Sequence, residues 1–295
     1  MLVTLVDVDS KIPNLALMKI SAWHKSQGDE VKFHDPMLDC PDLIYASKIF
    51  DFTPDYDYFP SDCKIVKGGS GYDPSAKLDF PDYDRIMPDY SLYGCDYALG
   101  RFTRGCPNRC PWCIVPGMDG NEVRHVADLS DFWNGQEVVR LLDDNIMADA
   151  DEFCRACGQL SRAGVKTIWD ALDIRLIDDQ TAQALASIKH AKRIHFAWDS
   201  HAQDEAVPRG IETLKRHGLK PWRLTFYVFV GFNTDPAYDM HRIMTLHALG
   251  AESFVMPFDK SDPYQRHLAR WCNNKIIFKS TTFDEYEPWV KERNN

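Results

Sequence analysis

Arg104-Gly105-Cys106-Pro107-Asn108-Arg109-Cys110-Pro111-Trp112-Cys113 is the most informative segment of this 295-residue chain. It places three thiols within eight residues and separates them by two prolines. Proline disfavours a helix interior and Gly105 permits a tight bend, so we expect a loop that wraps three sulfur atoms around one centre. Three thiolates suit a soft metal centre, either zinc or an iron–sulfur cluster.

The cysteine loop follows the first of six strand candidates that alternate with helices along the chain. These strands are expected at residues 97–103, 138–143, 165–170, 192–198, 223–230 and 252–257. Strands joined by crossover helices form a parallel sheet, and ligands of such sheets bind at the carboxyl ends of the strands. The position of the loop and its chemistry therefore agree.

Cys-x3-Cys-x2-Cys, with an aromatic residue before the last cysteine, resembles the signature of the radical S-adenosylmethionine (SAM) superfamily. The resemblance covers about residues 96–258. It implies an α/β fold with a partial (β/α)6 barrel, a [4Fe-4S] cluster on Cys106, Cys110 and Cys113, and SAM on the open iron. Trp112 matches the aromatic residue that packs near the adenine. The implied reaction is reductive cleavage of SAM to a 5′-deoxyadenosyl radical, which abstracts hydrogen from a substrate.

The same resemblance assigns further residues to SAM. Asp143, Asp144 and Asn145 follow the second strand, where the family holds the amino group of SAM; the glycines of the family pattern are missing here. Asp173 and Arg175 follow the third strand and would face the SAM carboxylate, because arginine is suited to bidentate carboxylate binding.

Two later strands complete the expected SAM site. Asp199 and Ser200 end the fourth strand and would bind the ribose, and backbone groups of Val230 and Gly231 would contact the adenine. No catalytic residue and no substrate are identified; a small molecule, a nucleotide or a peptide are all open. The implied electron donor is a reductant such as flavodoxin or ferredoxin.

Four parts are expected along the chain. They are a small Rossmann-like α/β domain that resembles a cobalamin-binding domain (1–71), a connecting segment (72–95), the radical SAM core barrel (96–258) and a C-terminal extension (259–295). In the first part, strands are expected at 2–6, 30–33, 43–46 and 64–66, with a helix that begins near Pro13 and ends by Gly28.

Three alternative functions remain open. The N-terminal part suggests a cobalamin-dependent radical SAM methyltransferase, although His34-Asp35-Pro36 is not a cobalt-ligand motif. Cys40, Cys63 and Cys95 match in number the second-cluster cysteines of methylthiotransferases, but their spacing is poor. The third alternative is a non-catalytic zinc-binding protein.

Composition excludes several classes of protein. The net charge is −10, from 44 acidic and 34 basic residues, so we expect no bulk binding to nucleic acid. No apolar segment reaches the roughly 18 residues of a membrane span. The first residues lack the basic leader of a secretory signal, so we expect a cytoplasmic protein in which the nine cysteines are not disulfide-bonded.

Overall fold

The computed structural model describes residues 1–78 and 80–293. These residues form two compact units, Met1–Glu152 and Phe153–Asn295, and each unit is described here by itself. The last two residues of the C-terminal extension expected at 259–295 lie outside the described residues. The domain boundaries expected from the sequence stay a prediction.

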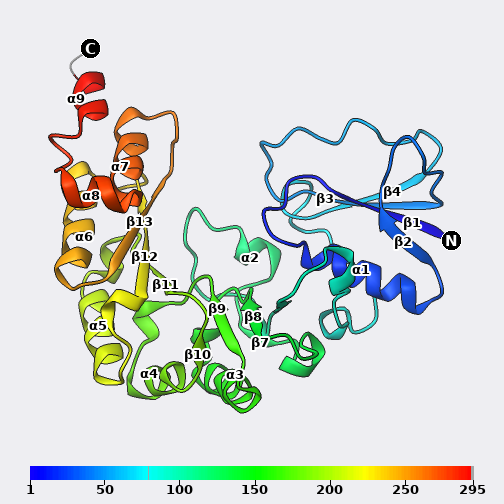
Figure 1. Cartoon of the computed structure of the whole chain (residues 1–295), viewed down its shortest axis with the longest axis horizontal. Helices are drawn as coiled ribbons and strands as arrows, with labels where there is room; N and C mark the ends of the chain where they lie inside the picture. The colour runs from blue at the N-terminus through cyan, green and yellow to red at the C-terminus, as the bar shows by residue number, and fades with distance from the viewer. Residues whose placement is uncertain (79, 294–295) are drawn as a thin grey trace. The chain divides into compact units, whose positions relative to one another are not determined.

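A parallel four-stranded sheet begins the first unit (Figure 1). Its strands are β1 (Leu2–Asp7), β2 (Glu30–Phe33), β3 (Leu43–Ser47) and β4 (Lys64–Gly68), in the order β2-β1-β3-β4. All four match the strands expected from the sequence. Because β2 and β3 lie on opposite sides of β1, the chain changes direction across the sheet between β1 and β3. Ligands of open α/β sheets bind at the carboxyl edge of such a point.

The helix α1 (Leu15–Ser26) packs against one face of this sheet (Figure 1). It begins where the Asn14 side chain accepts hydrogen bonds from the backbone N–H groups of Ala16 and Leu17, at 3.1 and 3.2 Å. Such a cap satisfies donors that have no partner within the helix. Successive side chains of a strand point to opposite faces of the sheet. Val3 and Leu5 therefore pack in the core under α1, and Val6 packs in a second core on the opposite face.

The rest of the first unit carries short strands and the cysteine loop. Its elements are β5 (Ala98–Gly100), β6 (Thr103–Arg104), α2 (Val115–Met118), β7 (Arg124–His125) and β8 (Val138–Leu141). Strand β5 pairs in parallel with β8, and β6 pairs antiparallel with β7. The single strand expected at 97–103 is therefore wrong in its extent: the chain leaves the β5–β8 pair at Gly100 and pairs elsewhere from Thr103.

The second unit is a series of parallel strands with helices between them. Its strands are β9 (Lys166–Trp169), β10 (Lys189–His190), β11 (Ile194–Ala197), β12 (Leu224–Val230) and β13 (Glu252–Pro257). Strand β9 pairs with β10, and the other three form a sheet in the order β11-β12-β13. Its helices are α3 (Ala150–Ala163), α4 (Asp179–Ala186), α5 (Ala206–Arg216), α6 (Pro236–Ala248), α7 (Pro263–Asn273), α8 (Lys275–Ser280) and α9 (Glu287–Arg293). The first three residues of α3 precede the start of this unit.

The expected α/β class with parallel strands is confirmed. The strands do not close into one continuous barrel sheet: within the second unit, a single parallel bridge between Leu172 and Phe196 links the segment after β9 to the β11–β13 sheet. Helices α6 and α7 pack on that sheet (Figure 1). The sequence interpretation missed β10, α4 and the helices α7 to α9.

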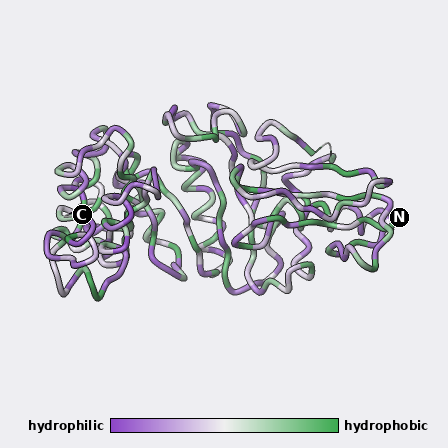
Figure 2. Tube along the Cα trace, turned by 90° about the horizontal axis from the view of Figure 1, so that it is seen from above, coloured by the Kyte–Doolittle hydropathy of each residue, from purple (hydrophilic) through white to green (hydrophobic). Residues whose placement is uncertain are grey.

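Hydrophobic and hydrophilic residues are mixed along the described parts of the chain (Figure 2). Within the described residues, no helix has both the length and the apolar character that crossing a membrane requires. This agrees with the absence of a long apolar segment in the sequence.

Gly100 offers a test of the packing at the end of β5. A Cβ atom added there would lie 2.2 Å from the ring of Phe132, which is fully buried. We expect Gly100→Ala to lower the free energy of unfolding by about 1–3 kcal/mol, measured by urea denaturation, because the ring must move in a dense core. Gly117→Ala is the matched control, since its Cβ would meet nothing within 4 Å. Equal stability of the two variants would contradict this packing.

Candidate functional site

The cysteine loop lies between β6 and α2 in the first unit. It begins with a backbone turn at Gly105, where φ is +92° and an added Cβ would lie 2.1 Å from the carbonyl oxygen of Glu122. Only glycine adopts this conformation in that space without strain. The backbone N–H of Cys106 donates to the carbonyl of Gly120 at 3.2 Å. The start of the loop is therefore fixed by the backbone itself.

The three cysteines of the loop differ in exposure. Cys106 is buried, Cys110 is half-buried and Cys113 is exposed. Among residues 1–78 and 80–293, no three His, Cys, Asp or Glu side chains are gathered as a metal ion would require. The donor set of three thiols fits a soft metal centre. Their role as cluster ligands stays a prediction.

The residues after β8 hold the chain that enters the cysteine loop. One carboxylate oxygen of Asp143, Oδ1, accepts from the N–H of Phe102 at 3.0 Å, and from the N–H and hydroxyl of Thr103 at 2.6 and 2.7 Å. Asp144 accepts from the N–H of Gly105 at 2.7 Å. These bonds satisfy backbone donors that have left the β5–β8 ladder. Asp143 and Asp144 therefore position the loop from a neighbouring strand.

Asn145, the third residue of this segment, reaches a cysteine directly. Its Nδ2 donates to the Sγ of Cys106 at 3.5 Å. An N–H that donates to sulfur stabilises a thiolate and helps to tune a metal centre. The sequence assigned Asp143 to Asn145 to the amino group of SAM. In the structure they contact the loop, and the second oxygen of Asp143, Oδ2, is buried without a partner among the described residues.

Burial changes the acidity of both carboxylates. It raises the pKa of Asp143 from 3.8 to about 6, because the hydrogen bonds from Thr103 and Phe102 only partly offset the loss of water. Burial also raises the pKa of Asp144, against the opposing effect of the Arg101 guanidinium.

An ionic cluster surrounds Asp119, at the end of α2. The Asp119 carboxylate lies 2.8 Å from Arg104 Nη1, 3.4 Å from Arg101 Nη1 and 3.8 Å from Lys77 Nζ. Arg104 also binds Asp84 through Nε and Nη2, one edge of its guanidinium, at 2.7–2.9 Å. Burial acts to raise the pKa of Asp119, but Arg104 and Arg101 outweigh it and lower the pKa. No sequence pattern indicated this cluster.

The expected SAM residues after β9 lie in the second unit and pair with each other. Asp173 caps the short 3-10 helix Ile174–Leu176 and accepts from Arg175 Nε and Nη2, at 2.8 and 2.5 Å. The edge of the Arg175 guanidinium that binds a carboxylate is therefore occupied by Asp173.

After β11, Asp199 accepts from the N–H of Phe229 at 3.2 Å, and burial raises its pKa. The backbone N–H groups of Asp199 and Ser200 donate to the same side-chain oxygen of Gln203, at 2.7 and 3.3 Å. Both residues thus lie at the carboxyl end of their strand, where the sequence placed them. Their role toward ribose stays a prediction.

The end of β12 is held by three contacts within the second unit. The carbonyl of Val230 accepts from the N–H of Phe258 at 3.0 Å, and the N–H of Gly231 donates to Thr234 at 3.1 Å. At Gly231, φ is +84° and an added Cβ would lie 2.2 Å from the Gln265 side chain. Glycine is therefore required here for packing. Trp112, the remaining expected SAM residue, is half-buried in the cysteine loop of the first unit.

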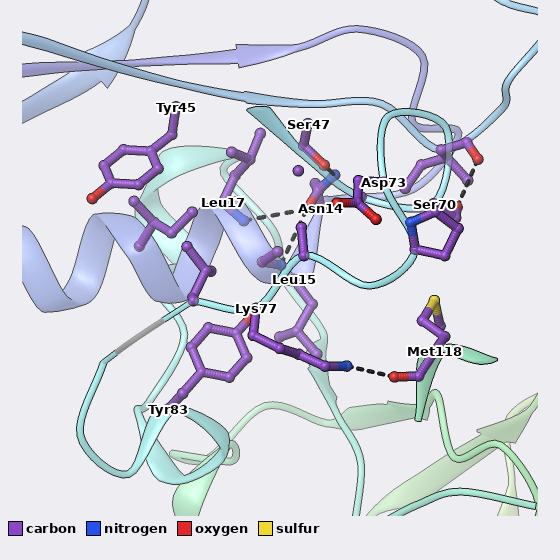
Figure 3. A pocket seen from close by; sticks show the side chains of 18 of the residues that line it. Asn14, Leu15, Leu17, Tyr45, Ser47, Ser70, Asp73, Lys77, Tyr83 and Met118 are labelled. Carbon is purple, nitrogen blue, oxygen red and sulfur yellow. Dashed lines mark hydrogen bonds between the residues drawn. The ribbon is translucent and has the colours of Figure 1, made fainter. Parts of the chain in front are cut away.

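A cavity of about 440 Å³ lies in the first unit, at the carboxyl edge of β3 and β4 (Figure 3). Its wall includes the start of α1 at Asn14, the end of β3 at Ser47, and Gly68 to Ser70 after β4. At Gly69, φ is +92° and an added Cβ would lie 2.5 Å from the carbonyl of Lys48. The glycines after β4 thus allow two backbone segments to approach closely beside the cavity.

Sequence comparisons find methylthiotransferases. No protein-family model matches the chain. The ribosomal protein uS12 methylthiotransferase RimO of Thiobacillus denitrificans is 24% identical over 142 residues, which is 46% of this chain and 29% of the relative. RimO of Aromatoleum aromaticum is 28% identical over 144 residues, 46% of this chain and 29% of the relative. The chain thus matches less than a third of the length of these relatives.

The fold is of the class seen in radical SAM enzymes, and the resemblance expected from the sequence is confirmed. A particular solved structure that shares it is TsrM from Kitasatospora setae, a radical S-adenosylmethionine methyltransferase with cobalamin and a [4Fe-4S] cluster bound. The alignment has a TM-score of 0.63 and 12% sequence identity, and it covers 87% of this chain and 74% of TsrM. The likeness therefore extends beyond either unit alone.

Asp143 predicts a pH dependence of stability. Its pKa rises from 3.8 in the unfolded chain to about 6 in the folded protein. Between these two pH values the folded state holds a proton that the unfolded state has released. The contribution of Asp143 protonation to the free energy of unfolding is therefore full below about pH 4 and is lost as the pH rises through about 6. Between about pH 4.5 and 7.5, we expect wild type to lose about 2–3 kcal/mol more stability than Asp143→Asn, measured by urea denaturation.

Asp96→Asn is the control for this measurement, because Asp96 is an exposed carboxylate of the same unit. It should retain the wild-type pH profile. If Asp143→Asn also retains it, Asp143 does not take up a proton in the folded state.

Proposed function

We propose that this chain is a radical SAM enzyme that holds a [4Fe-4S] cluster on Cys106, Cys110 and Cys113. The observation that carries the proposal is the set of three cysteines on one loop, close after the first strand of a series of parallel strands. The shared fold with a radical SAM methyltransferase supports it. When bound there, the cluster and SAM supply reductive cleavage to a 5′-deoxyadenosyl radical, which removes a hydrogen atom from the substrate.

The chain's own residues prepare the loop for this ligation. Gly105 makes the turn, Asp144 holds its N–H, and Asn145 donates to the sulfur of Cys106, so one ligand is oriented and buried in advance. Cys110 and Cys113 lie nearer to solvent and can be reached by a cluster that is delivered from outside. Preorganising one ligand reduces the conformational entropy that binding must overcome.

SAM would contact residues of several strand ends. In this proposal they are Trp112, Asp143, Asp144, Asn145, Asp173, Arg175, Asp199, Ser200, Val230 and Gly231. Arg175 would exchange its bond with Asp173 for one with the SAM carboxylate. The electron would come from a reductant such as flavodoxin or ferredoxin, and the substrate would be a small molecule, a nucleotide or a peptide.

Replacement of the loop cysteines tests the proposal. We expect Cys106→Ala, Cys110→Ala and Cys113→Ala each to reduce the iron content of anaerobically reconstituted protein to background, because three thiolates are needed to hold the cluster. Formation of 5′-deoxyadenosine from SAM, with dithionite as the reductant, should be lost in parallel.

Cys40→Ala is the matched control, because Cys40 is a free, exposed thiol outside the loop. It should retain the iron and the SAM cleavage of wild type. Wild-type protein that binds zinc alone, or that cleaves no SAM after reconstitution with iron and sulfide, would rule out the proposal and favour the zinc-binding alternative.

A second candidate function is cobalamin-dependent methyl transfer. The fold likeness to TsrM and the cavity at the carboxyl edge of the N-terminal sheet favour it. Among the described residues, those that line this cavity include no His, so the protein would hold cobalamin by the cavity wall and not by an imidazole on cobalt. His34 does not serve either, because its side chain is buried and lies 3.1 Å from the Thr4 hydroxyl.

Equilibrium titration with hydroxocobalamin, followed by absorbance, tests this candidate. We expect saturable binding with one corrinoid per chain. A chain that remains free of corrinoid, while it still binds iron and cleaves SAM, would exclude methyl transfer through cobalamin and leave the first proposal intact.

The methylthiotransferase alternative rests on sequence similarity and on the number of N-terminal cysteines. Cys40 lies just before β3 and Cys63 just before β4, so both lie near the amino ends of adjacent strands, opposite the edge that carries the cavity. Cys95 follows the 3-10 helix Tyr90–Leu92 and donates from its sulfur to the carbonyl of Tyr97. No observation of the described residues specifically favours a second cluster.

A further inference from the structure

One wall of the N-terminal cavity is apolar. Helix α1, strand β4 and the segment after β4 contribute its side chains, and Leu15 and Leu17 of α1 are among those drawn in Figure 3. These aliphatic residues are Leu15, Leu17, Ile20, Val66 and Leu78. Its volume of about 440 Å³ lies within the usual range of small-molecule sites. This wall provides a surface for an apolar group of roughly that size.

The lining of the cavity is also rich in cations. Among the described residues, five Lys or Arg residues and three Asp residues line the cavity, although the whole chain carries a net charge of −10. The five are Lys67, Lys77, Arg101, Arg104 and Arg124, and the three are Asp73, Asp84 and Asp119. Local positive charge in an acidic protein attracts anions to that place and repels cations from it.

Arg101 is the cation of this wall whose hydrogen-bonding capacity is least used. Its Nη1 makes one long bond to Asp119, at 3.4 Å, and lies 3.9 Å from Asp144. Within the described residues, its Nε is buried without a partner. Arg104, on the same wall, shows the contrast, because its Nε and Nη2 both bind Asp84. A guanidinium carries five donors, and donors buried without a partner destabilise the protein.

We propose that the cavity binds a small molecule with an apolar body and one anionic group, a carboxylate or a phosphate. The anion pairs with Arg101, with Lys77 at the mouth, and the apolar body lies against Leu15 and Val66. This assignment goes beyond the radical SAM function and does not require the cluster. It concerns the same cavity as the cobalamin candidate and is an alternative to it, whereas its failure would leave the radical SAM proposal standing.

Charge balance explains the choice of an anion. Arg104 makes the shortest contacts to Asp84 and Asp119, whereas Arg101 and Lys77 lie farther from the Asp119 carboxylate, at 3.4 and 3.8 Å, so an anion competes only with these longer contacts. A cation at the same place would be repelled by Arg101 and Lys77. A neutral ligand would displace water from Arg101 without replacing its hydrogen bonds, which is unfavourable in a partly buried site.

Isothermal titration of the whole chain, without added iron, tests the proposal. The probes are octyl phosphate, octanoate and 1-octanol, which share the apolar chain and differ in the head group. We expect saturable binding of at least one of the two anions, and affinity for 1-octanol at least about tenfold lower, as for loss of a charge-assisted contact. The stronger of the two anions identifies the head group. Binding of 1-octanol as tight as that of both anions would overturn the proposal.

Three variants locate the binding site. Arg101→Gln should weaken binding of the anion by about tenfold or more, and Lys77→Gln, at an exposed position, should weaken it by a smaller factor. Ala76→Trp should weaken binding of all probes, because Ala76 is an exposed residue of the cavity wall and the added ring fills its mouth.

Arg209→Gln and Ala191→Trp are the matched controls, since both residues are exposed and lie in the second unit. Both controls should bind the anion as wild type does. Thermal melting of each variant separates loss of the site from loss of the fold. Anion binding that survives both Ala76→Trp and Lys77→Gln, in protein that melts as wild type does, would place the ligand elsewhere and overturn the assignment.

Discussion

The carboxylates of Asp143 and Asp144 hold the backbone that leads into the cysteine loop, and the candidate metal site depends on them. The loop is short and contains two prolines, so it cannot satisfy its own backbone donors as a helix or a strand does. Pairing of β8 with β5 brings the residues after β8 beside Phe102 to Gly105. There, the side chains after β8 accept hydrogen bonds from the backbone N–H groups of the loop entrance. Burial of these carboxylates raises their pKa, which is the energetic cost of this arrangement.

Charge is distributed unevenly in this acidic chain. The cavity wall gathers Lys and Arg around Asp119, and the surface elsewhere carries the excess of acidic residues that the net charge reports. Net charge predicts solubility and long-range attraction, but a ligand responds to the field within a few ångströms of its own charge. The cavity beside α1 is therefore suited to an anion even though the protein as a whole repels one.

Strands and helices with a strong local pattern were predictable from the sequence. The apolar segments 2–6 and 223–230 form strands as expected, and the first helix begins after Asn14, close to the expected Pro13. The segment 97–103 was not predictable as two strands, because its division depends on Asp143, forty residues away. β10 has two residues, which is too short to leave a periodic pattern.

The sequence by itself determined the cysteine spacing, the alternation of strands and helices, and hence the resemblance to radical SAM enzymes that the shared fold confirms. These are local features, set by neighbours along the chain. Only the tertiary structure decided that Asp143 to Asn145 support the loop, and that Lys77, Arg101 and Asp119 meet at one cavity. Strand pairing and chain crossing bring such residues together, and no spacing in a single sequence records which distant side chains become neighbours.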